Sequence, residues 1–224
     1  MFRDRRDAGR QLAELLVPYA ASNPVVLGLP RGGVVVAAEV AARLEAPLDI
    51  LVVRKLGSPW QPELGLGAIA EGGVRVLNEG LVADEGLSPA QLDRVTQRER
   101  AELERRVALY RRGHPRLDLR DRTVLVIDDG LATGFTARAA VEAVRGAGAR
   151  RIILAVPVAS GDRIEGLQDV VDEVAAVDTP PWFFAIGEFY EDFGQISDAE
   201  IVAILDEAPS RAKRGGHVAD ELPR

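Results

Sequence analysis

Two adjacent carboxylates near the middle of the chain, Asp128 and Asp129, are followed within a few residues by a glycine between two threonines. They directly follow the apolar run 123–127, which is typical of a buried strand. Neighbouring carboxylates can accept hydrogen bonds from a diol or hold Mg²⁺ through oxygen. The small-residue turn after them opens a helix, and free backbone N–H groups at a helix start can surround a phosphate. One loop of this kind can therefore bind a phosphorylated sugar at both ends.

A second anion site is predicted about 100 residues earlier, where the apolar run 25–29 leads into Pro30, Arg31, Gly32 and Gly33. The Arg31 guanidinium and the backbone N–H groups of the two glycines could bind an anion at the C-terminal end of a strand. Alone, this Arg-Gly-Gly sequence is weak evidence for an anion site, because a simple turn explains it better. Ligands of parallel sheets bind at this end of the strands, so the two segments support each other.

The elements that would position these segments alternate along the chain. Short apolar runs are separated by helical segments, which predicts an α/β fold with a largely parallel sheet and helices on its faces. The predicted strands are 25–29, 48–53, 74–77 (an edge strand), 123–127, 152–157 and 173–177. The predicted helices are 4–20, one from about Gly33, 89–112, 136–145, 162–167 and 198–207.

Two segments interrupt this alternation. Residues 56–73 are rich in glycine and proline, which predicts an irregular excursion of the kind that often forms a lid or binding loop. After it, Ser88, Pro89 and Gln91 form a strong helix start, with an N-cap, a proline at the first helical position and a capping-box glutamine. The helix 89–112 is therefore expected to cover the core.

Composition narrows the function classes. The chain has 224 residues, of which 47% are hydrophobic and 28% charged, as in ordinary globular domains. We expect one domain over residues 1–210, including the covering helix 89–112 and C-terminal hood elements, and a polar tail over 211–224. The net charge of −7 argues against a nucleic-acid partner, because general affinity for polyanions depends on excess positive charge.

Residue types and patterning exclude further classes. The absence of cysteine and the presence of only two histidines exclude disulfides, thiolate nucleophiles and zinc fingers. No apolar stretch approaches the roughly 18 residues of a membrane span, and the first residues lack the apolar core of a signal peptide. The sequence therefore predicts a cytoplasmic protein without a membrane partner.

The segment 123–137 resembles the PRPP-binding motif of type I phosphoribosyltransferases, in which two acids follow a strand and precede a Thr-Gly-x-Thr sequence. The resemblance extends over residues 25 to about 193. It implies a mainly parallel five-stranded sheet flanked by helices, with a small hood and a mobile loop, the latter in the place of 56–73. It also implies Mg²⁺-dependent transfer of ribose 5-phosphate from PRPP to a small nitrogenous acceptor, expected to be a nucleobase, with release of pyrophosphate.

The resemblance also implies roles for individual residues. Asp128 and Asp129 would be the catalytic pair, contacting the ribose hydroxyls directly or through Mg²⁺, with Glu191 as a further metal ligand. The 5-phosphate would be bound by Ala132, Thr133, Gly134, Phe135 and Thr136. Pyrophosphate would be bound by Arg31, Gly32, Gly33 and Lys55, with a cis peptide bond between Arg31 and Gly32. The base would meet Trp182 and Phe184.

Several alternatives stay open. The aromatic residues around Trp182 fit a hydrophobic core as well as a base site. Residues 158–160 lack the lysine with which hypoxanthine-guanine enzymes read the exocyclic oxygen, which leaves the acceptor unnamed and a homodimer undecided. A regulatory protein that senses PRPP or a nucleotide without turning it over would use the same two loops. A receiver domain would also begin with a strand and two acids, but the only later lysine is Lys213 in the tail.

Overall fold

A five-stranded parallel sheet forms the centre of the protein, in the order β2-β1-β6-β7-β8. The computed structural model describes residues 1–62, 64–132 and 134–208; the predicted polar tail 211–224 lies outside them. The strands are β1 (Val25–Gly28), β2 (Leu48–Ile50), β6 (Thr123–Ile127), β7 (Arg151–Val158) and β8 (Glu173–Asp178). This arrangement confirms the predicted α/β fold.

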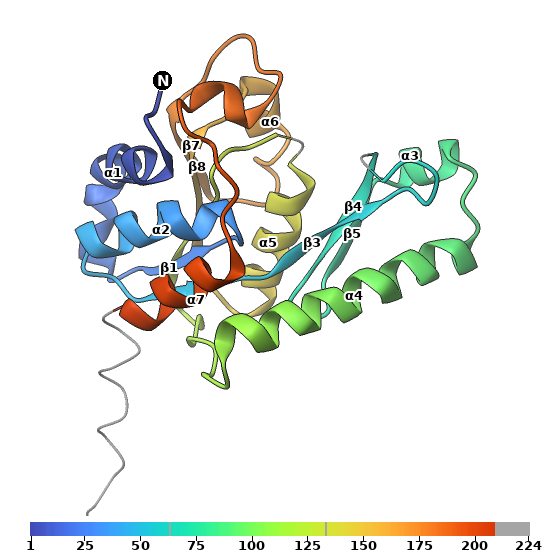
Figure 1. The fold of residues 1–224 in the computed structure, drawn as a ribbon, viewed down its shortest axis with the longest axis horizontal. Helices are drawn as coiled ribbons and strands as arrows, with labels where there is room; N and C mark the ends of the chain where they lie inside the picture. The colour runs from blue at the N-terminus through green and yellow to red at the C-terminus, as the bar shows by residue number, and fades with distance from the viewer. Residues whose placement is uncertain (63, 133, 209–224) are drawn as a thin grey trace, which may run out of the picture.

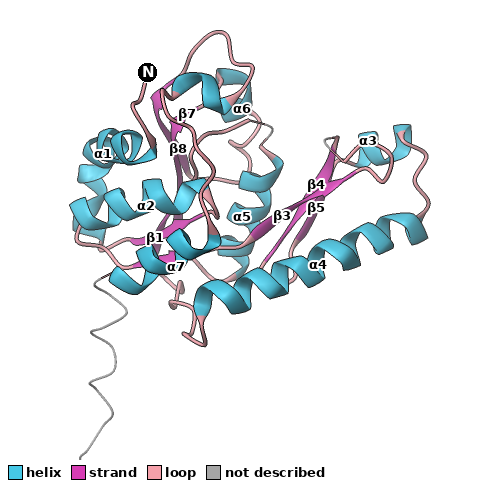
Figure 2. Cartoon of the chain, in the orientation of Figure 1, coloured by secondary structure: helices cyan, strands magenta, loops and turns pink. Residues whose placement is uncertain are grey.

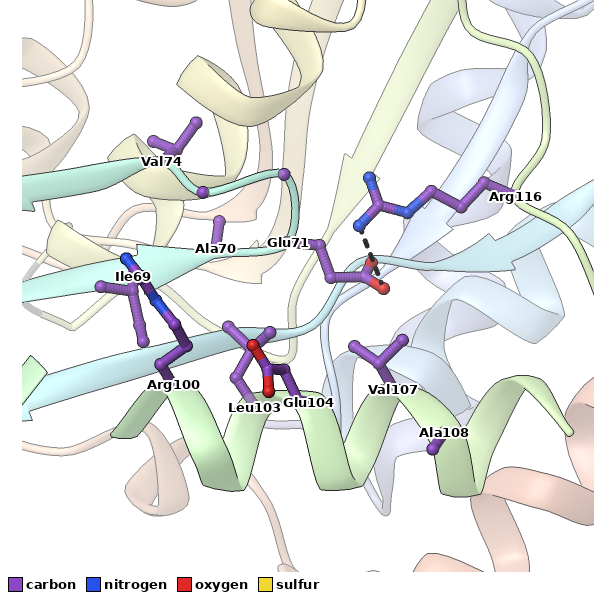
Figure 3. A pocket seen from close by; sticks show the side chains of 12 residues that line it. Ile69, Ala70, Glu71, Val74, Arg100, Leu103, Glu104, Val107, Ala108 and Arg116 are labelled. Atoms are coloured by element: carbon purple, nitrogen blue, oxygen red, sulfur yellow. Dashed lines mark ion pairs between the residues drawn. The ribbon is translucent and has the colours of Figure 1, made fainter. Parts of the chain in front are cut away.

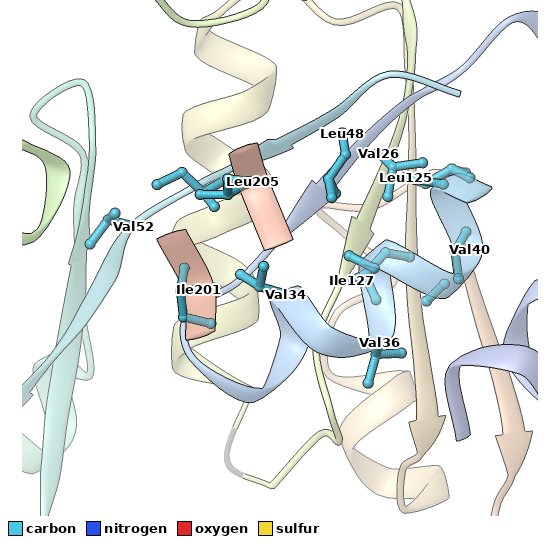
Figure 4. Packing of buried hydrophobic residues seen from close by; sticks show 14 of the residues in the cluster. Val26, Val34, Val36, Val40, Leu48, Val52, Leu125, Ile127, Ile201 and Leu205 are labelled. Carbon is cyan, nitrogen blue, oxygen red and sulfur yellow. The ribbon is translucent and has the colours of Figure 1, made fainter. Parts of the chain in front are cut away.

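Helices cover both faces of this sheet (Figures 1 and 2). The helices outside the second sheet described below are α1 (Arg5–Leu16), η1 (Val17–Ser22), α2 (Gly32–Arg43), α5 (Phe135–Gly146), α6 (Gly161–Glu165), η2 (Ile186–Phe189) and α7 (Asp198–Glu207). Alternate residues of one strand enter different clusters: Val26 packs with α1 and α2, whereas Val25 packs with α5. The strands are apolar on both faces because both faces are covered. Figure 4 shows α2 and α7 packed over the first face.

A second, antiparallel sheet projects beside the core and forms, with two helices, a lateral unit that we define as residues 53–111 (Figure 1). Its elements are β3 (Val53–Gly57), β4 (Gly65–Ala70), β5 (Arg75–Leu77), α3 (Glu79–Asp84) and α4 (Pro89–Arg111). The predicted edge strand forms as β5, at the edge of this second sheet. The predicted helix 89–112 forms as α4, but it lies along the second sheet rather than over the parallel one. Within the described residues, no helix is both long and apolar enough to cross a membrane.

The prediction that residues 56–73 are irregular is wrong in part, because Leu56 and Gly57 belong to β3 and Gly65–Ala70 form β4. The predicted strand 48–53 is likewise divided, since β2 ends at Ile50 and β3 begins at Val53. The glycines permit close strand contact: a Cβ on Gly67 would lie 2.0 Å from the Val76 carbonyl oxygen. Glycine in a strand often marks such a close approach rather than a loop.

Helix α4 begins as the sequence predicts. The Ser88 side chain accepts from the Gln91 backbone N–H and the Gln91 side chain accepts from the Ser88 backbone N–H, a complete capping box. Val95 and Leu103 are buried against the lateral sheet. At the other end, Tyr110 donates to Asp198 of α7 at 2.6 Å, so the helix joins the lateral unit to the core.

A buried cluster of charges fixes the base of the lateral unit. Arg111 donates to both carboxylate oxygens of Asp49 at 2.9 and 3.0 Å. It also donates to both oxygens of Glu71 at 3.1 Å and to the Ile50 carbonyl at 2.9 Å. All three charged side chains are buried. Buried charges are tolerated when they are paired and hydrogen-bonded, so this one guanidinium ties α4 to β2 and to the turn after β4.

The substitution Arg111→Met is expected to lower the free energy of unfolding by about 3–5 kcal/mol, because it removes the buried guanidinium that pairs with two buried carboxylates. Arg112→Met is the matched control, since the exposed Arg112 pairs at the surface with Asp206 and such pairs contribute about 0–1 kcal/mol. Urea denaturation measures both. Equal losses in the two variants would show that the cluster does not hold the unit in place.

Candidate functional site

The two predicted anion loops meet at the C-terminal ends of neighbouring strands. β1 and β6 pair in parallel with Gly28 opposite Ile127, so the segments that follow them start side by side. A Cβ on Gly32 would lie 1.8 Å from Asp129 Oδ2, and a Cβ on Gly33 would lie 2.7 Å from the Ile127 carbonyl oxygen. Only backbone fits between the loops, and the structure thus brings the glycine pair and the acid pair together.

The cis peptide bond of this loop lies between Pro30 and Arg31. The prediction of a cis Arg31–Gly32 bond is therefore wrong by one residue. α2 already begins at Gly32, and the Val34 N–H donates to the Arg31 carbonyl at 3.2 Å, so the peptide after Arg31 belongs to the helix start. Arg31 itself is exposed at the N-cap.

Both helices that start at this site lack a side-chain cap among the described residues. α2 begins after Arg31 and α5 after Gly134, without a capping side chain at either N-cap position, as also holds for the short α6. In contrast, Asp4, Ser88 and Ser197 cap α1, α4 and α7. Backbone N–H groups at uncapped helix starts favour anions.

The predicted 5-phosphate loop precedes α5. Ala132 is exposed, and Phe135 and Thr136 open the helix and are half-buried. Gly134 has a φ of 80°, a left-handed conformation that favours glycine. Thr133 lies outside the described residues.

The two acids of the pair have different surroundings. Asp128 Oδ1 accepts from the Asp129 backbone N–H at 2.9 Å. Loss of solvation, and then the negative charge of Asp129, raise the pKa of Asp128 well above its usual 3.8. Asp129 forms an ion pair with Arg5, whose Nε donates to Asp129 Oδ2 at 2.7 Å. The pair therefore combines one compensated carboxylate with one that is costly to ionise.

Sequence reasoning missed Arg5 and Tyr190, which reach the acid pair from distant segments. The Tyr190 hydroxyl donates to the Asp129 main-chain oxygen at 2.6 Å. The first residues of the chain, which we call the N-terminal arm, lie beside the 189–192 segment. Phe2 forms a β-bridge with Tyr190, and the Phe2 N–H donates to the Phe189 carbonyl at 2.8 Å. The only signal was the run of arginines in the first ten residues, which nothing in the sequence connects to Asp129.

The aromatic segment lies beside the acid turn and divides into two groups. A Cβ on Gly130 would lie 2.6 Å from Ile186 Cγ2, so the segment contacts this turn directly. Phe183 and Phe189 stack with their ring centroids 5.3 Å apart. Trp182 and Phe184, the two predicted base contacts, are 78% and 84% exposed. The core explanation of the aromatic residues therefore does not apply to these two.

The donor set at the acid pair fits Mg²⁺ in part. Mg²⁺ is usually held by one or two carboxylates together with substrate oxygens and water, and Asp128 with Asp129 provides such a set. The Glu191 side chain is exposed, and its backbone N–H donates to the Phe2 carbonyl at 2.8 Å. Among the described residues no three acidic or histidine side chains form a metal-binding cluster.

Lys55, the remaining predicted pyrophosphate contact, lies on β3 of the lateral unit. It stands opposite Ala68, and a Cβ on Gly65 would meet its Cε at 3.0 Å. The neighbouring Arg54 is paired with Glu99 of α4 at 2.6 Å. The structure thus places Lys55 on the antiparallel sheet rather than in the loops that hold the acid pair and the glycines.

A separate pocket of about 430 Å³ lies between α4 and the turn after β4 (Figure 3). Arg100, Glu104 and Val107 line it from α4, and Glu71 with its partner Arg116, 3.4 Å away, closes one end. None of the predicted site residues lines this pocket. It borders the buried charge cluster at the base of the lateral unit.

The substitution Gly33→Ala is expected to lower the free energy of unfolding by about 1–3 kcal/mol, as overpacking does. The added methyl group would lie 2.7 Å from the Ile127 carbonyl oxygen and 2.8 Å from Asp128 Cα. Both are backbone atoms at the end of a buried strand, which cannot move away as a flexible side chain could. Gly146→Ala in α5 meets nothing within 4 Å and is expected to be neutral or stabilising by about 0.5–1 kcal/mol. Urea denaturation compares the two, and a neutral Gly33→Ala would contradict the close packing.

Asp128→Asn is expected to raise the melting temperature at pH 7. A carboxyl whose folded-state pKa is raised stabilises the fold fully below its unfolded pKa, here 3.8, and loses this contribution as pH rises through the folded value. The gain should therefore disappear below about pH 3.8. Asp129→Asn should instead lower the melting temperature at pH 7, since it leaves Arg5 buried without its partner. A lower melting temperature for Asp128→Asn would refute this difference between the acids.

Comparisons with known proteins agree with this geometry. The model of the family described as "Phosphoribosyl transferase domain" matches residues 5–193. The Mycobacterium tuberculosis (strain H37Rv) protein named "Putative phosphoribosyl transferase Rv0571c" is 51% identical over 208 residues, which are 93% of this chain and 47% of that protein. Its counterpart MT0597 in strain CDC 1551 gives the same values. The chain thus spans about half the length of the curated relatives it matches.

A solved structure is similar over nearly the whole chain. TT1426 from Thermus thermophilus is 46% identical, with a TM-score of 0.78 over 92% of this chain and 97% of that chain. The match of the family model includes both loops, the acid pair and the aromatic segment. On its sequence, its sheet and these relatives, the chain belongs to the phosphoribosyl transferase domain family.

Proposed function

We propose that this chain transfers ribose 5-phosphate from PRPP to a nitrogen nucleophile, expected to be a nucleobase, and releases pyrophosphate. The observation that supports this most directly is the contact of Gly32 and Gly33 with Asp128 and Asp129. Because two anion-binding segments flank one acid pair, a sugar that carries phosphate at one end and pyrophosphate at the other can contact all three. A turn that only connects a strand to a helix would need neither a second anion loop nor an acid pair.

Each part of PRPP has a matching group in this arrangement. The 5-phosphate would be bound by the free N–H groups at the start of α5, after the left-handed Gly134. The pyrophosphate would be bound by the N–H groups of Gly32 and Gly33 and by the exposed guanidinium of Arg31. Between them, Asp128 and Asp129 would accept hydrogen bonds from the ribose hydroxyls. Helix starts and guanidinium groups are strong phosphate binders.

Bond exchange at the anomeric carbon requires little covalent chemistry from the protein. The bond from C1 to the pyrophosphate oxygen breaks, a bond from C1 to the acceptor nitrogen forms, and that nitrogen releases a proton. Positioning of the two reactants and stabilisation of the leaving pyrophosphate by Arg31 and backbone N–H groups would lower the barrier. Mg²⁺ held by Asp128 and Asp129 would neutralise charge on the phosphates.

The acceptor would enter beside the aromatic segment. Trp182 and Phe184 are exposed next to a segment that packs on the acid turn, and flat exposed rings suit a planar heterocycle. Base–aromatic stacking tolerates different bases because every base has a π-face. We therefore propose a planar nitrogenous base as the acceptor, without choosing among purines and pyrimidines.

The double substitution Asp128→Asn with Asp129→Asn is expected to weaken PRPP binding by about 100-fold or more, because hydrogen bonds to charged groups contribute about 1.5–3 kcal/mol each. Asp93→Asn on the exposed face of α4, where Asp93 pairs with Arg75, is the matched control. Isothermal titration calorimetry with PRPP and Mg²⁺ measures both. Unchanged affinity in the double variant would refute the assignment of the acid pair.

Pyrophosphate release separates an enzyme from a sensor on the same fold. The wild-type protein is incubated with PRPP, Mg²⁺ and a panel of purines, pyrimidines and small amines. Release that depends on one class of acceptor supports transfer and identifies the acceptor. Tight PRPP binding without release for any acceptor would overturn the proposed transfer in favour of a regulatory protein that senses PRPP.

A further inference from the structure

The N-terminal arm places one arginine directly on the acid pair. Phe2 and Arg3 run beside the 189–192 segment, and the Phe2 and Arg3 carbonyls accept from the backbone N–H groups of Glu191 and Asp192 at 2.8 and 2.9 Å. The Asp4 side chain then caps α1, which fixes Arg5 in the first turn. The backbone at Arg5 is therefore fixed by the pairing of the residues before it and by the helix that follows it.

The Arg5 guanidinium is enclosed where the glycine loop, the acid turn and the aromatic segment meet. Its Nε donates to Asp129 Oδ2 at 2.7 Å and its Nη1 to the Gly194 carbonyl at 2.8 Å. Its Cζ lies 3.7 Å from the Phe193 ring centroid, and a Cβ on Gly32 would come within 2.6 Å of Nε. The side chain is only 10% exposed. A cation with these contacts is strongly localised.

Asp129 consequently has a cation as an ion-pair partner, whereas Asp128 has none among the described residues. Asp129 Oδ2 is bound by Arg5, and its main-chain oxygen is bound by the Tyr190 hydroxyl. Asp128 Oδ1 accepts from the backbone N–H of the next residue, and among the described residues Asp128 makes no ion pair with an arginine or lysine, since Arg5 pairs with Asp129. Two adjacent acids of the same type thus differ in how much of their charge is already balanced.

We propose that Arg5 is a positioning residue that serves Asp129 as a built-in counterion and orients it toward the ribose hydroxyls, so that Asp128 is the one uncompensated carboxylate offered to a divalent cation. The identity of the sugar ligand rests on the proposed function; the inequality of the two acids does not. With Arg5 in place, the acid pair offers a metal ion one uncompensated carboxylate. The metal ion therefore reaches its full affinity only when oxygen atoms of the substrate also bind it. This arrangement makes metal and substrate bind together.

Removal of the built-in cation should strengthen metal binding to the free protein. We expect Arg5→Gln to bind Mn²⁺, used as a paramagnetic substitute for Mg²⁺, about tenfold more tightly than the wild type without PRPP, since a nearby positive charge of this kind commonly changes ionic equilibria by a factor of ten or more. Arg5→Lys should stay close to the wild type. Arg6→Gln is the matched control, because Arg6 is exposed on the same turn and pairs with Glu39.

Electron paramagnetic resonance of free Mn²⁺ measures these affinities. A merely structural role of Arg5 predicts unchanged or weaker Mn²⁺ binding in Arg5→Gln, and either result would overturn the proposal. If Arg5→Gln does not fold, the double variant Arg5→Gln with Asp129→Asn removes both charges and should keep the wild-type Mn²⁺ affinity, whereas Asp128→Asn should lose about tenfold. Equal losses in these two variants would also overturn it.

The PRPP arm of the experiment distinguishes this proposal from the proposed function. With PRPP and Mg²⁺, Arg5→Gln should bind PRPP about tenfold more weakly, because Asp129 loses its orientation, and Arg6→Gln should bind it normally. If the wild-type protein binds no PRPP, the proposed function fails, and the Mn²⁺ measurements still decide the role of Arg5.

Discussion

The contact between the Gly32–Gly33 backbone and the acid pair is the constraint on which the rest of the site depends. It exists because β1 and β6 are neighbours in register, so that their following segments leave the sheet at the same edge. A side chain at either glycine would occupy the space of Asp129 or of the Ile127 carbonyl. The buried sheet makes the two loops rigid, and the glycines bring them close enough for the proposed anion sites to meet one ligand.

The same region departs from the rules that hold elsewhere in the protein. α1, α4 and α7 have side-chain caps, whereas the helices that start at the site have none among the described residues. Loss of solvation and the neighbouring charge of Asp129 raise the pKa of Asp128, while the surface acid Glu102 is paired with two arginines that lower its pKa to about 2. Unsatisfied groups gathered at one edge of an otherwise well-satisfied fold are the pattern expected of a binding site.

Local patterns made most of the fold predictable. The strand 123–127 and the helix 198–207 have the predicted limits, and the capping box at Ser88 forms as the sequence indicates. The glycines and prolines of 56–73 predict irregular backbone, whereas in the structure Gly67 lets β4 approach β5 closely. The wrong cis bond came from transferring a family feature without knowing that α2 starts at Gly32.

The acid pair and the glycines could be predicted from sequence because each lies next to a recognisable strand end. Arg5 could not, since it meets Asp129 across 124 residues and depends on an arm whose pairing with residues 189–192 has no local signature. Exposure within the aromatic segment could not be predicted either: Phe183 packs on Phe189, while its neighbours Trp182 and Phe184 face solvent. Such differences arise from tertiary packing, which neighbouring residues of equal hydrophobicity do not reveal.

Helix α4 has 23 residues, a rod of about 34 Å at 1.5 Å per residue. One end supports the antiparallel strands, and the other carries Tyr110 and Arg111 into contact with α7 and β2. The contacts of Tyr110 and Arg111 fix this end of α4. If the antiparallel strands moved toward the edge of the parallel sheet, α4 would rotate about Arg111 and shift the contact of Tyr110 with Asp198. Movement of the antiparallel strands and the position of α7 are thus coupled through α4.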